Sequence, residues 1–169
     1  MCGVAGIGLL ATGAIAYKAR ERPMDKAENR RKAWKALPNT NIPENVIIDR
    51  FEFVTSKGIR LYMVEFRPVK SKGVICICHG YADQMDWLWY PRCLRLAKEG
   101  YTVIGVDLEG HGLSDGILVY IPSFTRLVEG AFEAFQSRRE KYSNQKWFIS
   151  GEVCNSLNSY TCGTNDFHP

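Results

Sequence analysis

The apolar residues of this chain fall into short uninterrupted runs that alternate with amphipathic stretches. The runs VICIC at 74–78, YTVIGVD at 101–107 and KWFIS at 146–150 show no strict apolar–polar alternation, which is typical of parallel strands buried on both faces. Between them, Asp86 to Lys98 and Phe124 to Glu140 carry apolar residues at helical spacing. This order predicts an α/β sheet with right-handed crossover helices.

Two earlier runs predict a β-hairpin ahead of the parallel strands. VIIDRFEFVT and IRLYMVEFRPV are rich in β-branched and aromatic residues and partly alternate between apolar and polar positions. Ser56-Lys57-Gly58 lies between them, and its glycine tolerates the positive φ that tight turns require. For the helices, Gly100 is the expected end of the first, and Ser123 is the expected N-cap of the second.

Residues 1–22 form an apolar segment with a basic end. The stretch from Cys2 to Tyr17 is uncharged, and three basic residues follow within Lys18 to Arg22. This is a membrane-type pattern, although its sixteen residues fall just short of the roughly 17 to 25 that span a bilayer. Two interpretations remain open: a membrane anchor or hairpin in one leaflet, or a targeting segment or apolar tail. We expect the rest of the chain at the cytoplasmic face of a membrane, or in the cytoplasm.

The remaining sequence divides into three parts. Residues 23–45 are polar and basic, and Pro38 and Pro43 limit the helix that AENRRKAWKAL predicts, so we expect a short amphipathic helix and a linker. Residues 46–152 contain the strand and helix patterns of the folded domain. Residues 153–169 lack apolar periodicity, and we expect them to be disordered.

Charge argues against a nucleic-acid partner. With 46% hydrophobic and 24% charged residues among 169, the composition is that of one ordinary folded domain. The net charge of +4 comes from Lys18 to Lys35, which carries eight basic and three acidic residues. A nucleic-acid-binding surface would spread its basic residues over a folded face instead.

The cysteines predict neither disulfides nor a metal site. The six cysteines show no paired spacing, which indicates reduced thiols. Cys76 and Cys78 share one face of a strand but lack a second ligand pair nearby, so zinc is disfavoured.

Two polar, glycine-containing loops follow predicted strands, where open α/β sheets hold their ligand chemistry. His79-Gly80-Tyr81 is either an oxyanion loop, in which the Tyr81 N–H faces developing negative charge, or a tight turn with a satisfied histidine. The second loop contains Gly110-His111-Gly112. Its glycine spacing misses that of a dinucleotide-binding loop by one residue, and no helix begins inside it. We interpret His111 as a structural residue that holds the loop in place, in preference to a general base.

Three motifs together resemble one enzyme family. The runs CHGYADQMDW, GYTVIGVDLEGHGLSDG with IPSF after it, and KWFISGE are similar to the monoacylglycerol lipase-like branch of the α/β-hydrolases, with its serine aminopeptidase-like, lysophospholipase and caffeoylshikimate esterase relatives. The resemblance covers Val46 to Glu152, the N-terminal part of such a domain. It implies an oxyanion donor at His79-Gly80-Tyr81 and a site wall at Gly110-His111-Gly112. It also implies a serine hydrolase for lipid esters, such as monoacylglycerols or lysophospholipids, without metal or cofactor.

The resemblance ends where the family places its nucleophile. The family's elbow reads G-x-S-x-G, because a strained turn lifts the serine above the sheet. This chain has Gly151-Glu152-Val153-Cys154-Asn155, so valine takes the serine position and asparagine that of the second glycine. The acid and base histidine of the family lie downstream, where seventeen residues follow Glu152. We therefore expect the N-terminal half of an α/β-hydrolase sheet, truncated at the elbow, and an inactive chain.

The tail offers no replacement triad. Cys154, Asp166 and His168 are formally a nucleophile, an acid and a base, but no pattern in the tail holds them within hydrogen-bond reach. The abrupt loss of the family pattern at Val153 favours intron read-through or a mistaken gene model, and a genuine short isoform is the alternative. The alternative function is that of a non-catalytic, partner-binding fragment. Because a truncated sheet leaves apolar faces without cover, we expect marginal stability.

Overall fold

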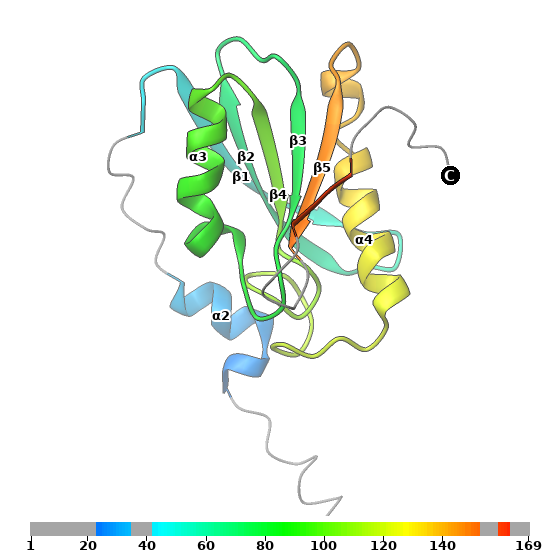
Figure 1. Ribbon diagram of the computed structural model, residues 1–169. Helices are drawn as coiled ribbons and strands as arrows, with labels where there is room; N and C mark the ends of the chain where they lie inside the picture. The colour runs from blue at the N-terminus through cyan, green and yellow to red at the C-terminus, as the bar shows by residue number, and fades with distance from the viewer. Residues whose placement is uncertain (1–22, 35–41, 153–158, 163–169) are drawn as a thin grey trace, which may run out of the picture.

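One mixed sheet organises the residues that the computed structural model describes, which are 23–34, 42–152 and 159–162 (Figure 1). Its strands are β1 (Val46–Val54), β2 (Arg60–Pro68), β3 (Val74–Cys78), β4 (Thr102–Val106), β5 (Trp147–Glu152) and β6 (Ser159–Cys162). They lie in the order β1-β2-β4-β3-β5-β6. The shorter helical elements are η1 (Pro23–Asp25), α2 (Ala27–Ala33), η2 (Met85–Trp89) and η3 (Glu140–Tyr142).

The predicted hairpin is confirmed. β1 and β2 pair antiparallel from Val46 opposite Pro68 to Val54 opposite Arg60. Gly58 in the connecting turn has φ of +75°, the left-handed conformation that the turn requires. β2 also pairs antiparallel with β4, so the hairpin joins the parallel part of the sheet at its β4 edge.

The three predicted parallel strands are also confirmed. β3 pairs parallel with β4 on one side and with β5 on the other. Every residue of β4 is buried, which explains its uninterrupted apolar run. Because parallel neighbours end at the same edge, the loops after β3 and β4 lie with the C-terminal end of β5 at one end of the sheet, the lower end in Figure 1.

Two helices cover opposite faces of this sheet. α3 (Tyr90–Lys98) packs in a buried cluster with Val103, whereas α4 (Phe124–Gln136) packs in a second cluster with Ile104. Since successive strand residues point to opposite faces, these neighbours on β4 place the two helices on either side. The α/β architecture with crossover helices is therefore as predicted.

The ends of the helices follow their sequence signals. The Ser123 side chain accepts a hydrogen bond from the Arg126 N–H, as expected of an N-cap, and Gly100 follows α3 with φ of +93°. α4 ends at Gln136, four residues before the predicted end, and η3 follows after a turn. The short helix predicted in AENRRKAWKAL is α2.

Part of the tail extends the sheet. Four residues of the segment that we expected to be disordered form β6, which pairs antiparallel with β5 from Ile149 opposite Cys162 to Glu152 opposite Ser159. β5 therefore has a neighbour on each side within the described residues. In the part of the chain that the structure describes, no helix has the length and apolar character needed to cross a membrane.

A buried carboxylate on β2 holds the segment that follows α4, including η3. Glu65 is fully buried and accepts hydrogen bonds from Lys141 Nζ (2.5 Å), Tyr142 Oη (2.6 Å) and Arg138 Nη2 (3.0 Å). Burial alone would raise the pKa of this carboxyl, but the hydrogen bonds from Lys141 and Tyr142 outweigh burial and lower the pKa of Glu65. Glu65 is thus a charged anchor between sheet and helix.

We predict that Glu65→Gln lowers the free energy of unfolding by about 2–4 kcal/mol, because it removes a buried charge whose partners lose hydrogen bonds. Urea unfolding of the full chain, followed by circular dichroism, measures this loss. Glu129→Gln is the matched control. Glu129 pairs with Lys57 on the surface, so this substitution should lower the unfolding free energy by under about 0.5 kcal/mol. Equal effects of the two substitutions would contradict the anchor role.

Candidate functional site

The loop after β3 begins with a buried histidine in a defined tautomer. His79 is 2% exposed, and its Nε2 accepts a hydrogen bond from the Leu108 N–H at 3.0 Å. Its Nδ1 therefore carries the proton and donates to the Gly80 carbonyl at 2.7 Å. Burial lowers the pKa of His79 to about 4, so the ring is neutral at physiological pH. His79 thus joins the loop after β3 to the loop after β4.

Tyr81 lies at the open side of the same loop. No acceptor for the Tyr81 N–H occurs among the hydrogen bonds of the described residues. The Tyr81 side chain is 53% exposed, and its hydroxyl donates to the Val119 carbonyl at 3.0 Å. A backbone N–H without a protein acceptor is the group that an oxyanion loop supplies, and this role for Tyr81 stays a prediction.

The loop after β4 is organised by the carboxylate of Asp107, which is 1% exposed. Asp107 Oδ1 accepts from the Met85 N–H at 2.7 Å, and Oδ2 accepts from the Leu113 N–H at 2.9 Å. Desolvation by burial raises the pKa of Asp107 to about 7, although both backbone hydrogen bonds lower it. One side chain therefore fixes the start of η2 and the middle of the glycine-containing loop.

Gly112 allows this loop to close over the carboxylate. Its φ is +46°, and a Cβ built at Gly112 would lie 2.0 Å from Asp107 Oδ2. Any side chain here would displace Asp107 from the Leu113 N–H. The predicted wall residues Gly110, His111 and Gly112 thus owe their positions to close backbone packing around Asp107.

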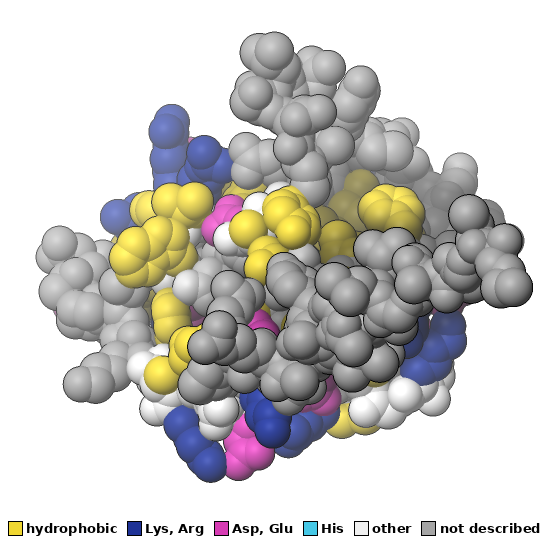
Figure 2. All heavy atoms as spheres, turned by 90° about the horizontal axis from the view of Figure 1, so that it is seen from below, with side chains coloured by type: hydrophobic (Ala, Val, Ile, Leu, Met, Phe, Trp, Pro, Cys, Tyr) yellow, Lys and Arg dark blue, Asp and Glu magenta, His cyan; other side chains and the backbone are white. Residues whose placement is uncertain are grey.

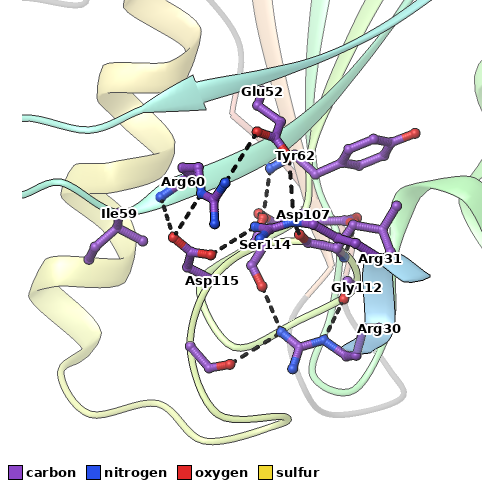
Figure 3. Close-up of polar contacts among 12 residues, drawn as sticks. Arg30, Arg31, Glu52, Ile59, Arg60, Tyr62, Asp107, Gly112, Ser114 and Asp115 are labelled. Atoms are coloured by element: carbon purple, nitrogen blue, oxygen red, sulfur yellow. Dashed lines mark hydrogen bonds and ion pairs between the residues drawn. The ribbon is translucent and has the colours of Figure 1, made fainter. Parts of the chain in front are cut away.

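Ser114 connects the same loop to the hairpin. The Ser114 hydroxyl donates to the Asp107 carbonyl and accepts from the Tyr62 N–H at 2.8 Å. The Asp115 carboxylate accepts from the Arg60 N–H at 2.9 Å. These bonds hold the loop against the N-terminal end of β2 (Figure 3).

His111 has the structural setting that its sequence context predicted. It is 1% exposed, and its Nδ1 lies 2.9 Å from the Glu109 carbonyl oxygen. The His111 ring lies 5.3 Å from the His79 ring and 5.7 Å from the Tyr81 ring, so the two predicted loops meet here. Burial lowers the pKa of His111 as well. A neutral, buried imidazole at this point pins the loops together.

Helix α2 clamps the wall loop from outside, which the sequence did not predict. Arg30 is 5% exposed and donates from Nε to the Gly112 carbonyl (2.7 Å) and from Nη2 to the Ser114 carbonyl (2.6 Å) and the Gly116 carbonyl (3.2 Å). Its Nη1 donates to two carbonyls just before α2. Figure 3 shows Arg30 reaching from α2 into the concave side of the loop.

Arg31 adds a second attachment. Its Nε donates to the Leu113 carbonyl at 2.9 Å, and its Nη2 pairs with Asp115 at 2.8 Å. Both arginines bind residues more than 80 positions further along the chain, so a segment expected to lead into a linker is part of the site's frame.

An apolar hollow of about 340 Å³ lies beside the predicted oxyanion loop. His79, Gly80, Tyr81 and His111 form its polar side, and Phe124, Val128 and Ile149 are among its apolar residues. Phe124 is 73% exposed and Val128 48% exposed, so this apolar lining is partly open within the described structure. The hollow could receive an apolar chain next to the Tyr81 N–H.

The predicted elbow is only partly described. Gly151 and Glu152 are the last residues of β5, at the end of the strand where the loops meet. Val153, Cys154 and Asn155 lie outside the described residues, as do Asp166 and His168. The degenerate elbow therefore remains a prediction from the sequence.

Thiol and metal chemistry have little support in the described residues. Burial raises the pKa of Cys78 to about 11 and that of Cys93 to about 12, so both are protonated thiols. Among the residues described, no group of three or more His, Cys, Asp or Glu side chains could hold a metal ion.

Comparison with known families gives a match over half of the chain. The model of the hydrolase family described as serine aminopeptidase, S33, matches residues 69–154. The match includes the predicted oxyanion loop, the predicted wall loop and the start of the predicted elbow.

Curated relatives match the same region. A caffeoylshikimate esterase from Arabidopsis thaliana is 29% identical over 122 residues, which are 63% of this chain and 37% of that protein. Bifunctional epoxide hydrolase 2 of Rattus norvegicus is 39% identical over 62 residues, which are 36% of this chain and 10% of that protein. The chain thus spans less than two fifths of the length of these relatives.

Solved structures share the fold. An esterase from Pyrococcus furiosus superposes with a TM-score of 0.53 at 21% identity, over 63% of this chain and 42% of that chain. A thermostable carboxyl esterase from Bacillus coagulans gives a TM-score of 0.51 at 16% identity, over 60% of this chain and 35% of that one. These similarities show the fold, which is that of an N-terminal portion of an α/β-hydrolase.

We predict that Arg30→Lys frees the wall loop, because a single ammonium cannot bind carbonyls on two sides as a planar guanidinium does. Hydrogen exchange of peptides covering 108–119 should accelerate at least about tenfold, with about 2–3 kcal/mol lost in unfolding free energy. Lys32→Gln is the control, since Lys32 is an exposed residue of α2 whose ion pair within the described residues is with Glu28. Unchanged exchange in Arg30→Lys would refute the clamp.

Two buried groups should oppose each other in the pH dependence of stability. The pKa of His79 is lower in the folded state, so its contribution is present above about pH 6.5 and is lost as pH falls toward 4. The pKa of Asp107 is higher in the folded state, so its contribution is present below about pH 3.8 and is lost as pH rises through 7. Each contribution to the unfolding free energy amounts to about 3–4 kcal/mol, and the two contributions nearly cancel.

We therefore predict that single substitutions reveal a dependence of the unfolding free energy on pH that nearly cancels in the wild-type chain. In His79→Gln, unfolding free energy should rise as pH falls from 7 to about 5, and in Asp107→Asn it should fall over the same range. Urea titrations at successive pH values measure both slopes. Slopes of the same sign in the two variants would contradict this assignment.

Proposed function

Because the chain belongs to the serine aminopeptidase, S33, family of hydrolases, we propose that it is the oxyanion-loop portion of a serine ester hydrolase that acts on lipid esters. Monoacylglycerols and lysophospholipids are the proposed substrates. The observation that carries this proposal is that the Tyr81 N–H has no acceptor among the described residues, and that Tyr81 lines an apolar hollow at the end of β3.

The geometry supports acyl-ester chemistry through three features. The Tyr81 N–H could donate to the oxyanion of a tetrahedral intermediate, where developing charge is best stabilised by fixed donors. The neutral His79 ring holds this loop against Leu108 without adding charge. The hollow of about 340 Å³ offers mainly apolar side chains, which suits an acyl chain better than a charged group.

A membrane surface is the proposed location of such a substrate. Trp87 and Leu88, in η2, and Tyr120, in the segment between β4 and α4, are each more than half exposed. Figure 2 views the lower end of the sheet and shows hydrophobic side chains in several groups across it. Together with the uncharged run from Cys2 to Tyr17, they favour attachment to the cytoplasmic face of a membrane.

The chain itself is proposed to be inactive. Acyl transfer requires a hydroxyl or thiol at the elbow, and Val153 offers only methyl groups at the serine position. A partner-binding role is the second candidate, and the exposure of Phe124 and Val128 beside the hollow favours it. Such a partner would cover the apolar lining that the described residues leave open.

We predict that a fluorophosphonate probe does not label this chain above its heat-denatured background, whereas an active serine esterase treated in parallel is labelled fully. The reason is the absence of an activated serine at position 153. Labelling that a short-chain ester suppresses would contradict the proposed inactivity.

Sequencing of transcripts across the codons for Ser150 to Asn155 separates the two candidates. A principal transcript that places serine after Gly151-Glu152 supports the hydrolase proposal. A principal transcript that encodes Val153 and the present tail favours the partner-binding role.

A further inference from the structure

A second hollow, a groove of about 550 Å³, adjoins the apolar hollow. Tyr81 lines the apolar hollow, whereas the next residue, Ala82, lines the groove. In the loop after β4, Val119 lines the groove and Ile121 lines the apolar hollow. The two chain segments that contain these residues therefore form a divide between the hollows.

Both segments of the divide contain a residue in the left-handed conformation. The Tyr120 N–H donates to the Ile117 carbonyl at 3.0 Å and closes a four-residue turn, of which Val119 is the third residue. Val119 has φ of +56°. A positive φ at this turn position favours glycine or asparagine, so a β-branched residue is strained there. Ala82, on the other segment, has φ of +61°.

Few polar contacts hold the turn in this conformation. In the part of the chain that the structure describes, two hydrogen bonds join residues 117–121 to other segments. The Val119 N–H donates to the Gly110 carbonyl at 2.7 Å, and the Val119 carbonyl accepts from the Tyr81 hydroxyl at 3.0 Å. The second bond joins the two segments of the divide. Its net stabilisation is of the same order as the cost of one strained residue, so the two effects nearly balance.

His111 lies at the divide. It is 1% exposed, lines both hollows, and its ring lies 5.7 Å from the Tyr81 ring. Its Nε2 has no hydrogen-bond partner within the described structure. Movement of Tyr81 and the turn would give this buried polar atom access to water or a ligand.

We propose that the Tyr81 hydroxyl is a latch that keeps the divide closed. When its hydrogen bond to the Val119 carbonyl breaks, the strained turn moves away and the apolar hollow joins the groove. The open form presents one longer apolar cleft with His111 between its two parts, and a ligand too long for either hollow binds this form alone. The latch does not require a serine nucleophile, so it is independent of the proposed hydrolase function.

Hydrogen exchange of the full chain, resolved by nuclear magnetic resonance, tests the latch. Tyr81→Phe keeps the ring but removes the hydroxyl, so the amides of Val119 and Tyr120 should exchange about three- to tenfold faster. The Leu113 amide, which Asp107 binds in the same loop, should be unchanged. Tyr120→Phe is the matched control, because Tyr120 is 56% exposed and its hydroxyl has no hydrogen-bond partner among the described residues. Equal exchange in the two variants, or equal acceleration at Leu113, would overturn the proposal.

Relief of strain should have the opposite effect. Val119→Asn keeps the backbone carbonyl and tolerates the positive φ, so the Tyr120 amide should exchange about three- to tenfold more slowly. Diethyl pyrocarbonate should modify His111 faster in Tyr81→Phe and more slowly in Val119→Asn than in the wild-type chain. Mass spectrometry measures this reaction, with the buried His79 as the internal reference. Unchanged or faster exchange in Val119→Asn would show that the closed turn is not strained, and would contradict the latch.

Discussion

The arrangement of the site depends on the carboxylate of Asp107. Its two oxygens accept from the N–H groups of Met85 and Leu113, which lie on separate loops. Gly112 leaves just enough space for this carboxylate, and Ser114 ties its backbone to β2. Burial raises the pKa of this carboxyl, so the hydrogen bonds that order the loops are set against a desolvation cost.

Other contacts extend this arrangement outward. His79 and His111 place two neutral rings between the loops after β3 and β4, and both rings lie beside the apolar hollow that Tyr81 also lines. Arg30 then encloses the wall loop from the N-terminal side. The result is a preorganised frame that we propose as the oxyanion side of an ester hydrolase site, and the sequence after it has valine where the resemblance places a serine. The described residues 23–34 and 42–152 thus keep this frame, although Val153 stands where the resemblance places the nucleophile.

Much of the fold could be predicted because its strands carry strong local signals. The continuous run VICIC, the alternation around Ser56-Lys57-Gly58 and the cap at Ser123 each have a direct physical cause. The role of Arg30 had no such signal, because an arginine that binds distant backbone carbonyls looks the same in sequence as one in a solvated linker. Asp107 was visible as an acid after a buried strand, but its two N–H donors come from tertiary structure. The pairing of β6 likewise depends on a neighbour, β5, rather than on its own pattern.

The most direct test of this account is nuclear magnetic resonance of the Met85 and Leu113 amide groups as a function of pH. If one carboxylate binds both, the two amide proton shifts should titrate together with a common midpoint near the Asp107 pKa of about 7, although they lie 28 residues apart in sequence. The Asp107→Asn variant should abolish both titrations. Independent midpoints, or titration of only one amide, would show that Asp107 does not hold the two loops together.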